Sequence, residues 1–231
     1  MLELGERRGK GKMLKVVVFD SGYGGELFAD LLEEELPILE VIRVIDWRHA
    51  EQILKSAKTA RAAAEEALRP YIGRVDLIVL ANHLLSFASL NYFRQKFENQ
   101  KFVGFEMWRP DTFFDQNVLT ITTTAASRTA VHRKFVRTLK RRALTLTVDS
   151  WPGRIDDGEL DADEIRVTIR RFVMEKNYEP SGVVLACGQL NDIKDEIERA
   201  FDTRVKIYSS FDGALRETCK ALKLRSSFKK K

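Results

Sequence analysis

A cysteine at the end of an apolar run is the residue best placed for chemistry in this chain. Cys187 follows the run at 182–186 and precedes Gly188 and Gln189, where a helix is expected to begin. The positive end of a helix dipole and its free N–H groups can stabilise a thiolate and lower the cysteine pKa from about 8.5. A small buried cysteine is equally common as an ordinary core residue, so this position alone leaves both interpretations open.

Two other apolar runs, at 14–19 and 75–81, end in polar loops of the same kind. Ligand-binding clefts in open α/β sheets lie beyond the carboxyl ends of the strands, so we expect these loops to share one cleft with Cys187. The side chains that the two loops contribute are Asp20, Ser21, Asn82 and His83.

Hydroxyl side chains fill a further loop, at 122–127. Hydroxyls and free N–H groups around Thr124 suit a carboxylate or a phosphate, although N-capping of the following helix would select the same residues. That helix, expected at 126–141, carries several basic side chains on one face. Such a face is usually just solvated, and nucleic-acid binding is the alternative.

Nucleotide and metal motifs are missing from the sequence. Gly22 and Gly24 lack the third glycine of the dinucleotide fingerprint, and no Gly-Lys-Ser or Gly-Lys-Thr segment occurs. The three histidines and two cysteines show no metal-ligand spacing. We therefore predict no metal, and no phosphate held by a P-loop or dinucleotide motif.

The composition is that of an ordinary soluble domain, with 44% hydrophobic and 32% charged residues in a chain of 231. No apolar run approaches the roughly 20 residues of a membrane helix, and the charged N-terminal segment does not resemble a signal peptide. Two cysteines cannot form a disulfide framework, and Cys219, at helical spacing from Leu215 and Leu222, is predicted to be a core residue. We expect reduced cysteines and a cytoplasmic location.

The basic charge is concentrated at the two ends of the chain. The net charge is +5, yet residues 223–231 alone carry five basic and no acidic side chains, and residues 1–12 carry four basic against two acidic ones. The remainder is therefore slightly acidic. Tails of this kind could contact nucleic acid or an anionic surface weakly, and the alternative is that they only aid solubility.

The elements that must position these loops alternate between strand and helix. Short runs rich in Val, Ile or Leu predict eight strands, at 14–19, 40–45, 75–81, 101–105, 117–122, 143–148, 182–186 and 204–208. Helices are expected between them, near 26–36, 50–69, 86–98, 126–141, 161–177, 191–201 and 211–223. This alternation is typical of a doubly wound α/β fold with mostly parallel strands.

Eight strands are more than one sheet of this length usually holds, so we expect two similar lobes with the cleft between them. The polar segment at 149–160 is expected to be a surface linker, and the segment at 109–111 a crossover. The predicted divisions are 13–98 plus 208–223 for the first lobe, 99–207 for the second lobe, and 1–12 and 224–231 for basic flexible tails.

Four loop segments carry a family resemblance. They are Val-Phe-Asp-Ser-Gly-Tyr-Gly-Gly at 18–25, Gly-Phe-Glu at 104–106, Thr-Ala-Ala-Ser at 124–127 and Leu-Ala-Cys-Gly-Gln at 185–189. In this order they resemble the Phe-Asp-Ser-Gly-x-Gly-Gly, Gly-Val-Ile-Glu-Pro, Thr-x-x-Ser and Leu-Gly-Cys-Thr-His motifs of the aspartate/glutamate racemase superfamily, and those of glutamate racemase most of all. The resemblance extends over nearly the whole chain.

The resemblance implies two pseudosymmetric α/β lobes and cofactor-independent proton transfer. In this family a thiolate removes the α-proton of an amino acid and a thiol on the opposite face returns one, because inversion at carbon requires two opposed acid/base groups. The catalytic residues that it implies are Cys187 and Asp20. The substrate-binding residues that it implies are Ser21, Asn82, His83, Thr124 and Gln189.

The chain departs from the family at its most important positions. Ala-Asn-His-Leu at 81–84 stands where the family has Ala-Cys-Asn-Thr, so Asn82 occupies the position of the first catalytic cysteine, and an amide cannot remove an α-proton. The threonine and histidine that follow the second cysteine are Gly188 and Gln189 here. His83 is the candidate replacement acid or base near neutral pH.

Three hypotheses remain open from the sequence. The first is a glutamate racemase-like enzyme that moves a proton at the α-carbon of an acidic amino acid or similar small carboxylate through Cys187. The second is a catalytically degenerate protein that binds a ligand or a partner on the same scaffold. The third is a decarboxylase or isomerase with a single cysteine. A homodimer is compatible with all three.

Overall fold

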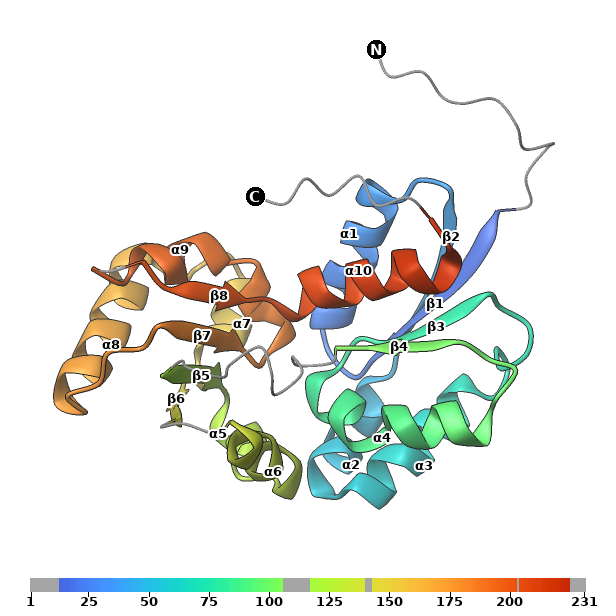
Figure 1. The fold of residues 1–231 in the computed structure, drawn as a ribbon, viewed down its shortest axis with the longest axis horizontal. Coiled ribbons are helices and arrows are strands. Elements are labelled where there is room, and N and C mark those ends of the chain that lie inside the picture. The colour runs from blue at the N-terminus through green and yellow to red at the C-terminus, as the bar shows by residue number, and fades with distance from the viewer. Residues whose placement is uncertain (1–12, 106–116, 140–142, 203, 225–231) are drawn as a thin grey trace, which may run out of the picture.

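Two lobes built on separate sheets make up the computed structural model of this protein (Figure 1). The structure describes residues 13–105, 117–139, 143–202 and 204–224. The predicted crossover at 109–111, Glu106 of the family motif and the predicted tails, apart from Leu224, lie outside these residues. No helix in the described segments is long and apolar enough to cross a membrane.

The two sheets repeat one arrangement. The strands of the first are β1 (Leu14–Asp20), β2 (Leu39–Ile45), β3 (Leu77–Leu80) and β4 (Phe102–Gly104), in the order β2-β1-β3-β4. Those of the second are β5 (Val118–Thr122), β6 (Ala143–Thr147), β7 (Gly182–Leu185) and β8 (Lys206–Tyr208), in the order β6-β5-β7-β8. All the pairings between these strands are parallel. The prediction of two pseudosymmetric α/β lobes is therefore confirmed.

Alternating side chains divide the first lobe into two cores. Val16 and Val18 of β1 face one core, and Val17 and Phe19 face the other, because successive residues of a strand point to opposite faces. The helices of this lobe are α1 (Gly24–Glu35), α2 (Ala50–Lys55), α3 (Ala57–Leu68) and α4 (His83–Lys96), with a 3-10 helix η1 (Trp47–His49). Side chains of α1 fill the first core, and those of α3 and α4 fill the second.

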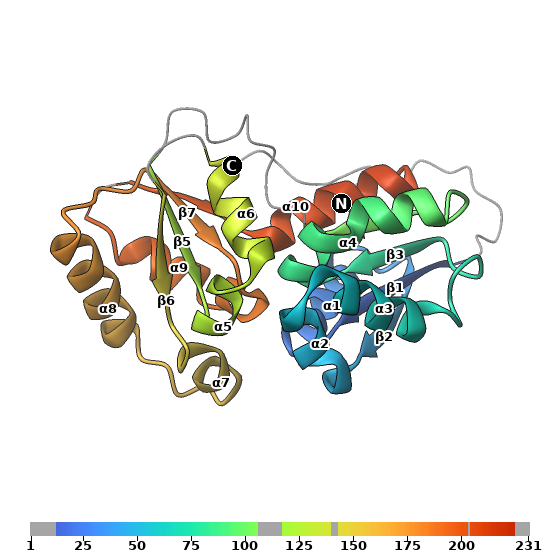
Figure 2. The same ribbon diagram turned by 90° about the horizontal axis from the view of Figure 1, so that it is seen from below.

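The second lobe has the same layering. Its helices are α5 (Thr124–Ser127), α6 (Ala130–Thr138), α7 (Trp151–Asp156), α8 (Ala162–Glu175) and α9 (Lys194–Arg199), with a 3-10 helix η3 (Gly188–Asn191). α7, α8 and α9 cover one face of the sheet, where Leu119 and Val183 are buried. α6 covers the other face, and Figure 2 shows it at the junction with α4 of the first lobe.

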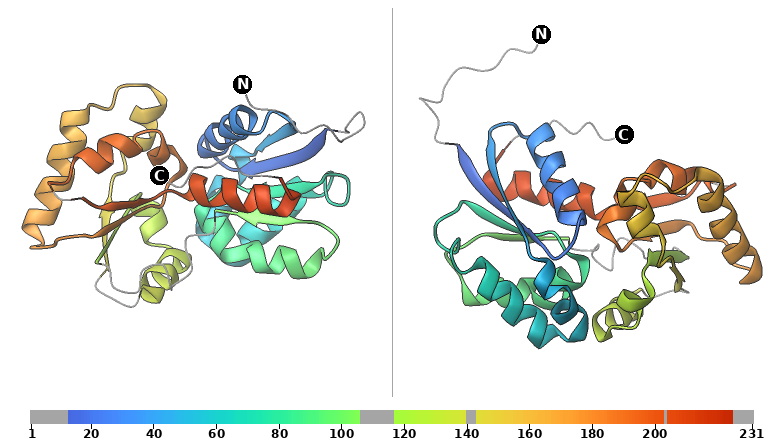
Figure 3. Two further views of the ribbon diagram at one scale, coloured as in Figure 1. Left: turned by 45° about the horizontal axis from the view of Figure 1, so that its top comes forward. Right: turned by 180° about the vertical axis from the view of Figure 1, so that it is seen from behind.

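The last helix returns to the first lobe. α10 (Ser210–Leu222) follows β8 of the second sheet but packs on the first sheet, as both views in Figure 3 show. Its Phe211 and Cys219 are buried there beside Phe28 of α1. At its start, the Ser209 hydroxyl caps the helix and also donates to the side-chain oxygen of Asn191 in η3. The predicted return of this helix and the core position of Cys219 are confirmed.

Two predicted boundaries of the first lobe are wrong. β4 pairs with β3, so the strand that was assigned to the second lobe, which was expected to begin at residue 99, extends the first sheet. The single helix expected at 50–69 is interrupted at Ser56, which has an extended backbone with φ of −164° and caps α3 with its hydroxyl. A residue with a capping side chain competes with helix continuation.

Two predictions for the second lobe also need correction. The expected linker at 149–160 contains α7, whose Trp151 is only 2% exposed and packs in the core of this lobe. A buried tryptophan anchors this turn-rich segment against the sheet. The helix expected at 126–141 is divided into α5 and α6, and Thr129 caps α6.

Two buried serines of α4 provide a matched test of the packing. The Ser86 hydroxyl donates to the Leu80 carbonyl at 2.7 Å and accepts from the Phe105 N–H at 2.9 Å, whereas the Ser89 hydroxyl has no partner in the described part of the chain. Ser86→Ala should lower the free energy of unfolding by about 1–2 kcal/mol, and Ser89→Ala should leave it equal or higher. Urea denaturation measures both, and equal effects would contradict this account.

Candidate functional site

A cavity of about 160 Å³ lies between the two lobes at the carboxyl ends of four strands. Pockets for drug-sized ligands are usually about 300–1,000 Å³, so this one suits a compact molecule. Four groups of residues line it: Asp20, Ser21 and Gly22 at the end of β1, Ala81 to Leu84 after β3, Thr122, Thr123 and Ala126 around the end of β5, and Ala186 to Gln189 after β7.

The strand order explains why these four loops meet. In each sheet, successive strands are added on one side and then on the other. The strand order therefore reverses between the two central strands, which are β1 and β3 in the first sheet and β5 and β7 in the second. Ligands bind open α/β sheets at such switch points, beyond the carboxyl ends of the strands. Here the switch points of both sheets open into a single cavity, as the sequence predicted for the loops of Asp20, Asn82 and Cys187.

Asp20 is a buried carboxylic acid at the end of β1, with 4% of its surface exposed. Its Oδ1 accepts from the Ser21 N–H at 2.6 Å and from the Asn82 amide at 2.9 Å. Burial raises the pKa of Asp20 to about 7, although these donors and the Gly25 N–H oppose the shift. The carboxyl group therefore changes charge near neutral pH.

Asn82 has two structural partners at the start of α4. Its side-chain oxygen accepts from the Leu85 N–H and so caps this helix, while its amide nitrogen donates to Asp20. Both ends of the amide are thus occupied by the protein. The predicted substrate-binding residue Asn82 lines the cavity, and its hydrogen bonds position the Asp20 carboxyl group.

Cys187 lies across the cavity from the first lobe, at the end of β7, and its thiol donates to the Gln189 side-chain oxygen at 3.1 Å. Burial, with the carboxylates of Asp20 and Asp156, raises the pKa of Cys187 to about 12. The predicted lowering of this pKa is wrong. The N–H groups of Gln189 and Leu190 do lower it, but η3 is a four-residue 3-10 helix and their effect is smaller than that of burial.

Gln189 links the thiol to a carboxylate that the sequence analysis missed. Its side chain makes a hydrogen bond to Asp156 at the end of α7, and burial raises the pKa of Asp156. An amide can orient the Cys187 thiol but cannot accept its proton. Asp156 was missed because its segment was expected to be a surface linker, and only the packing of α7 brings it to η3.

His83 lines the cavity as a neutral imidazole. Neither ring nitrogen has a hydrogen-bond partner in the described segments, and the ring packs 5.5 Å from Phe135 and 6.5 Å from His132, measured between ring centroids. Burial, followed by the charge of His132, lowers the pKa of His83 to about 3, and the Phe105 backbone opposes this in part. The prediction that His83 acts as an acid or base near neutral pH is therefore wrong, whereas its ring remains available to bind a ligand.

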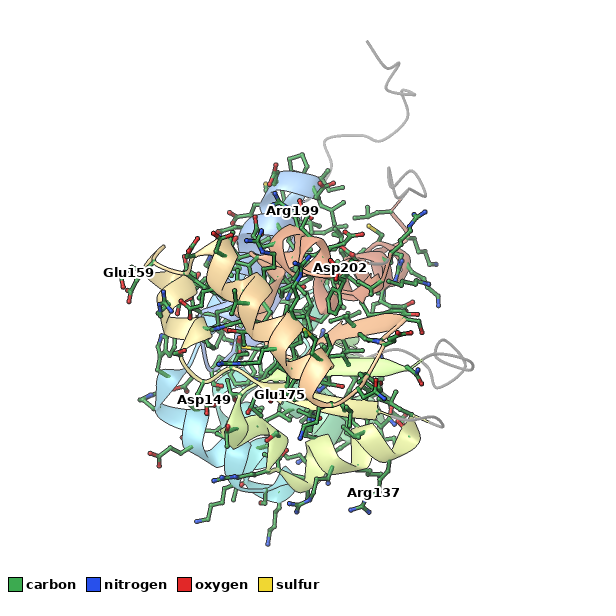
Figure 4. All side chains as sticks on the ribbon, turned by 90° about the vertical axis from the view of Figure 1, so that its left-hand side faces the viewer. Arg137, Asp149, Glu159, Glu175, Arg199 and Asp202 are labelled. Carbon is green, nitrogen blue, oxygen red and sulfur yellow. The ribbon has the colours of Figure 1, made fainter. Side chains whose placement is uncertain are left out.

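The hydroxyl residues are divided between the cavity and its surroundings. Ser21 lines the cavity, and its hydroxyl makes no hydrogen bond within the described residues. Thr124 does not belong to the lining of this cavity: its N–H donates to Asp149 at 2.6 Å, on the side of the second lobe shown in Figure 4. Thr122 and Thr123 line the cavity in its place.

Two glycines hold the lobes together over the cavity. A Cβ atom at Gly24 would lie 2.8 Å from the Gly188 Cα, and one at Gly188 would lie 2.7 Å from the Gly24 Cα. Real Cβ atoms do not approach other atoms so closely, so only glycine fits on either side. This contact places the start of α1 against η3, and the Asn191 side chain holds the Gly188 carbonyl at 2.7 Å.

A search of solved structures shows where this arrangement recurs. Glutamate racemase from Escherichia coli, in complex with L-glutamate and the activator UDP-MurNAc-Ala, superimposes with a TM-score of 0.75 over 93% of this chain and 84% of that chain, at 20% sequence identity. This chain has the fold of the aspartate/glutamate racemases. The fold-level resemblance to this superfamily is confirmed.

Two other racemases share the fold. Aspartate racemase from Picrophilus torridus matches with a TM-score of 0.61 at 14% identity, covering 94% of this chain and 96% of that one. Allantoin racemase from Klebsiella pneumoniae matches with a TM-score of 0.56 at 15% identity, covering 94% of each chain. No protein-family model and no curated protein sequence matches the chain. The racemase fold is therefore shown by structure.

The glycine contact of this racemase fold makes a testable prediction. Gly188→Ala should lower the free energy of unfolding by about 1–3 kcal/mol and increase the rate at which a thiol reagent modifies Cys187 in the native protein, because the lobes must separate. Gly153→Ala in α7 is the control, since a Cβ there meets no atom within 4 Å. A Gly188 variant that behaves like the control would disprove a tight contact.

Proposed function

We propose that this protein moves a proton at the α-carbon of an acidic amino acid or a similar small carboxylate, without a cofactor. One observation carries the proposal: Asp20 of the first lobe and Cys187 of the second lobe line the same cavity, with pKa values of about 7 and about 12. At neutral pH one group can accept a proton while the other holds one. Two such groups from opposite lobes satisfy the requirement for opposed acid and base.

In this mechanism Asp20 accepts a proton and Cys187 donates one. The Asp20 carboxylate takes the α-proton of the substrate. The carbanion that remains is stabilised as an enolate by the α-carboxylate of the substrate. The Cys187 thiol then donates its proton to the other face, and a thiolate remains. Asp20 becomes neutral in the same cycle, so a proton must pass from Asp20 to the thiolate, through solvent, before the next turnover.

Because the pKa values of Asp20 and Cys187 differ, the α-protons of the two enantiomers should exchange at different rates. The state with charged Asp20 and neutral Cys187 is populated at neutral pH, whereas the reverse state with a thiolate is rare because of the high thiol pKa. The enantiomer whose α-proton faces Asp20 should therefore exchange faster. The family's assisting histidine is Gln189 here, and an amide cannot take the proton from the thiol.

Binding of the substrate falls to the remaining polar groups of the cavity. The ring nitrogens of His83 have no hydrogen-bond partner in the described residues, the Ser21 hydroxyl also lines the cavity, and the Thr123 hydroxyl, which accepts from the Ala126 N–H, can still donate. The structure of the Escherichia coli enzyme with L-glutamate supports an amino-acid ligand for this fold. No lysine or arginine lines the cavity among the described residues, so hydroxyls and backbone N–H groups must hold the carboxylate.

The raised pKa of Cys187 also favours a second candidate. A thiol that stays protonated is suited to one task, the protonation of a carbanion left when a substrate loses carbon dioxide. A single-cysteine decarboxylase or isomerase would need no second base. A catalytically degenerate binding protein is the third alternative, and the occupied Asn82 and Gln189 amides are compatible with it.

Exchange of the α-proton in heavy water tests the proposal. L- and D-glutamate and L- and D-aspartate should be incubated with the protein and followed by NMR. We expect exchange of one enantiomer to rise with pH up to about 7, where Asp20 loses its proton, and to fall by about 10²–10⁴ in Cys187→Ala and Asp20→Asn.

Cys219→Ala is the matched control, because Cys219 is the other cysteine and lies in the core of the first lobe. Exchange that persists in Cys187→Ala would remove Cys187 from the mechanism. If none of the four amino acids exchanges, the acidic amino-acid hypothesis fails, and the decarboxylase and binding alternatives remain.

A further inference from the structure

A second pocket lies between α6 and β6 of the second lobe, and His132 lines it. It has a volume of about 380 Å³ and shares no lining residue with the cavity between the lobes among the described residues. We call it the α6 groove. Its lining residues are Ser127, His132, Arg133, Val136, Arg137, Thr145 and Thr147.

The α6 groove carries positive charge that the protein does not neutralise. Arg133 and Arg137 are four residues apart and so share one face of α6, and the described lining contains no carboxylate. Within the described residues Arg137 has no ion pair, and the Arg133 guanidinium donates to the Arg128 carbonyl at 2.9 Å. Figure 4 shows Arg137 extending outward from α6. By contrast, Arg43, Arg154 and Arg170 each form an ion pair with a carboxylate.

Hydrogen-bonding groups complete the groove wall. His132 is 2% exposed, its Nε2 lies 3.4 Å from the Thr145 hydroxyl, and its Nδ1 has no partner in the described part of the chain. Burial lowers the pKa of His132, so the ring is neutral at pH 7. Hydroxyls of Ser127, Thr145 and Thr147 add donors of the kind that recognise oxyanions.

We infer that the α6 groove binds a small molecule through an oxyanion group, either a phosphate or a carboxylate cluster. Two guanidinium groups on one helix face can engage the oxygens of such a group with charge-assisted hydrogen bonds. The groove adjoins the cavity between the lobes, because the His132 ring lies 6.5 Å from the ring of His83, which lines that cavity. The inference does not depend on the proposed function.

Calorimetric titration of the full chain with inorganic phosphate and, separately, with citrate tests this site. We expect saturable binding of at least one of them at concentrations up to about 10 mM. The double variant Arg133→Gln, Arg137→Gln should weaken it by about tenfold or more. Both side chains are exposed, so the variant should fold normally.

Two control variants distinguish anion binding in the α6 groove from binding elsewhere on the protein. Lys134→Gln removes one charge from the same helix outside the groove, and Ser21→Ala alters the cavity between the lobes; both should bind within about twofold of the parent protein. The imidazole NMR signal of His132, assigned by its loss in His132→Asn, should shift on saturation. Tighter phosphate binding would identify a phosphate group, and tighter citrate binding a carboxylate cluster.

Several outcomes would overturn the inference. The first is that neither anion binds at these concentrations. The second is that Lys134→Gln weakens binding as much as the double variant does, which would indicate general charge attraction. The third is that Ser21→Ala abolishes binding, which would place the anion between the lobes. An unchanged His132 signal at saturation would also contradict it.

Discussion

The close approach of Gly24 and Gly188 is the constraint on which the site depends. Each sheet has its own switch point, and the close contact of these two backbones, together with the packing of α4 on α6, brings both to one cavity. Asn191 reinforces it, because this side chain holds the Gly188 carbonyl and also accepts from Ser209 at the start of α10. The helix that connects the second lobe back to the first is thereby tied to the loop that carries Cys187.

Burial between the lobes then determines the chemistry of the cavity. Asp20 and His83 are buried and Cys187 is half-buried, and desolvation shifts each group toward its neutral form: the pKa rises for the carboxyl and the thiol and falls for the imidazole. Amides rather than charged groups surround the two proton carriers, since Asn82 holds Asp20 and Gln189 holds Cys187. A cavity of this kind can transfer a proton to or from a substrate, but it does not stabilise a thiolate.

Much of the fold could be predicted from the sequence, because the strands of a parallel sheet are buried on both faces and appear as apolar runs. All eight strands lie where such runs predicted them, within a few residues. What failed depended on contacts distant in sequence: the pairing of β4 with β3, the burial of Trp151, and the link from Gln189 to Asp156. The direction of the Cys187 pKa shift also failed, since burial, which depends on tertiary packing, outweighs the local N–H groups.

The central claim is that burial between the lobes poises Asp20 to change charge near neutral pH. Carbon-detected NMR titration of its side-chain carboxyl, assigned by the loss of one signal in Asp20→Asn, tests this most directly. The account predicts a midpoint at about 7. A midpoint near the ordinary aspartate value of about 4 would show that the carboxyl group is solvated and would contradict the burial from which its role follows.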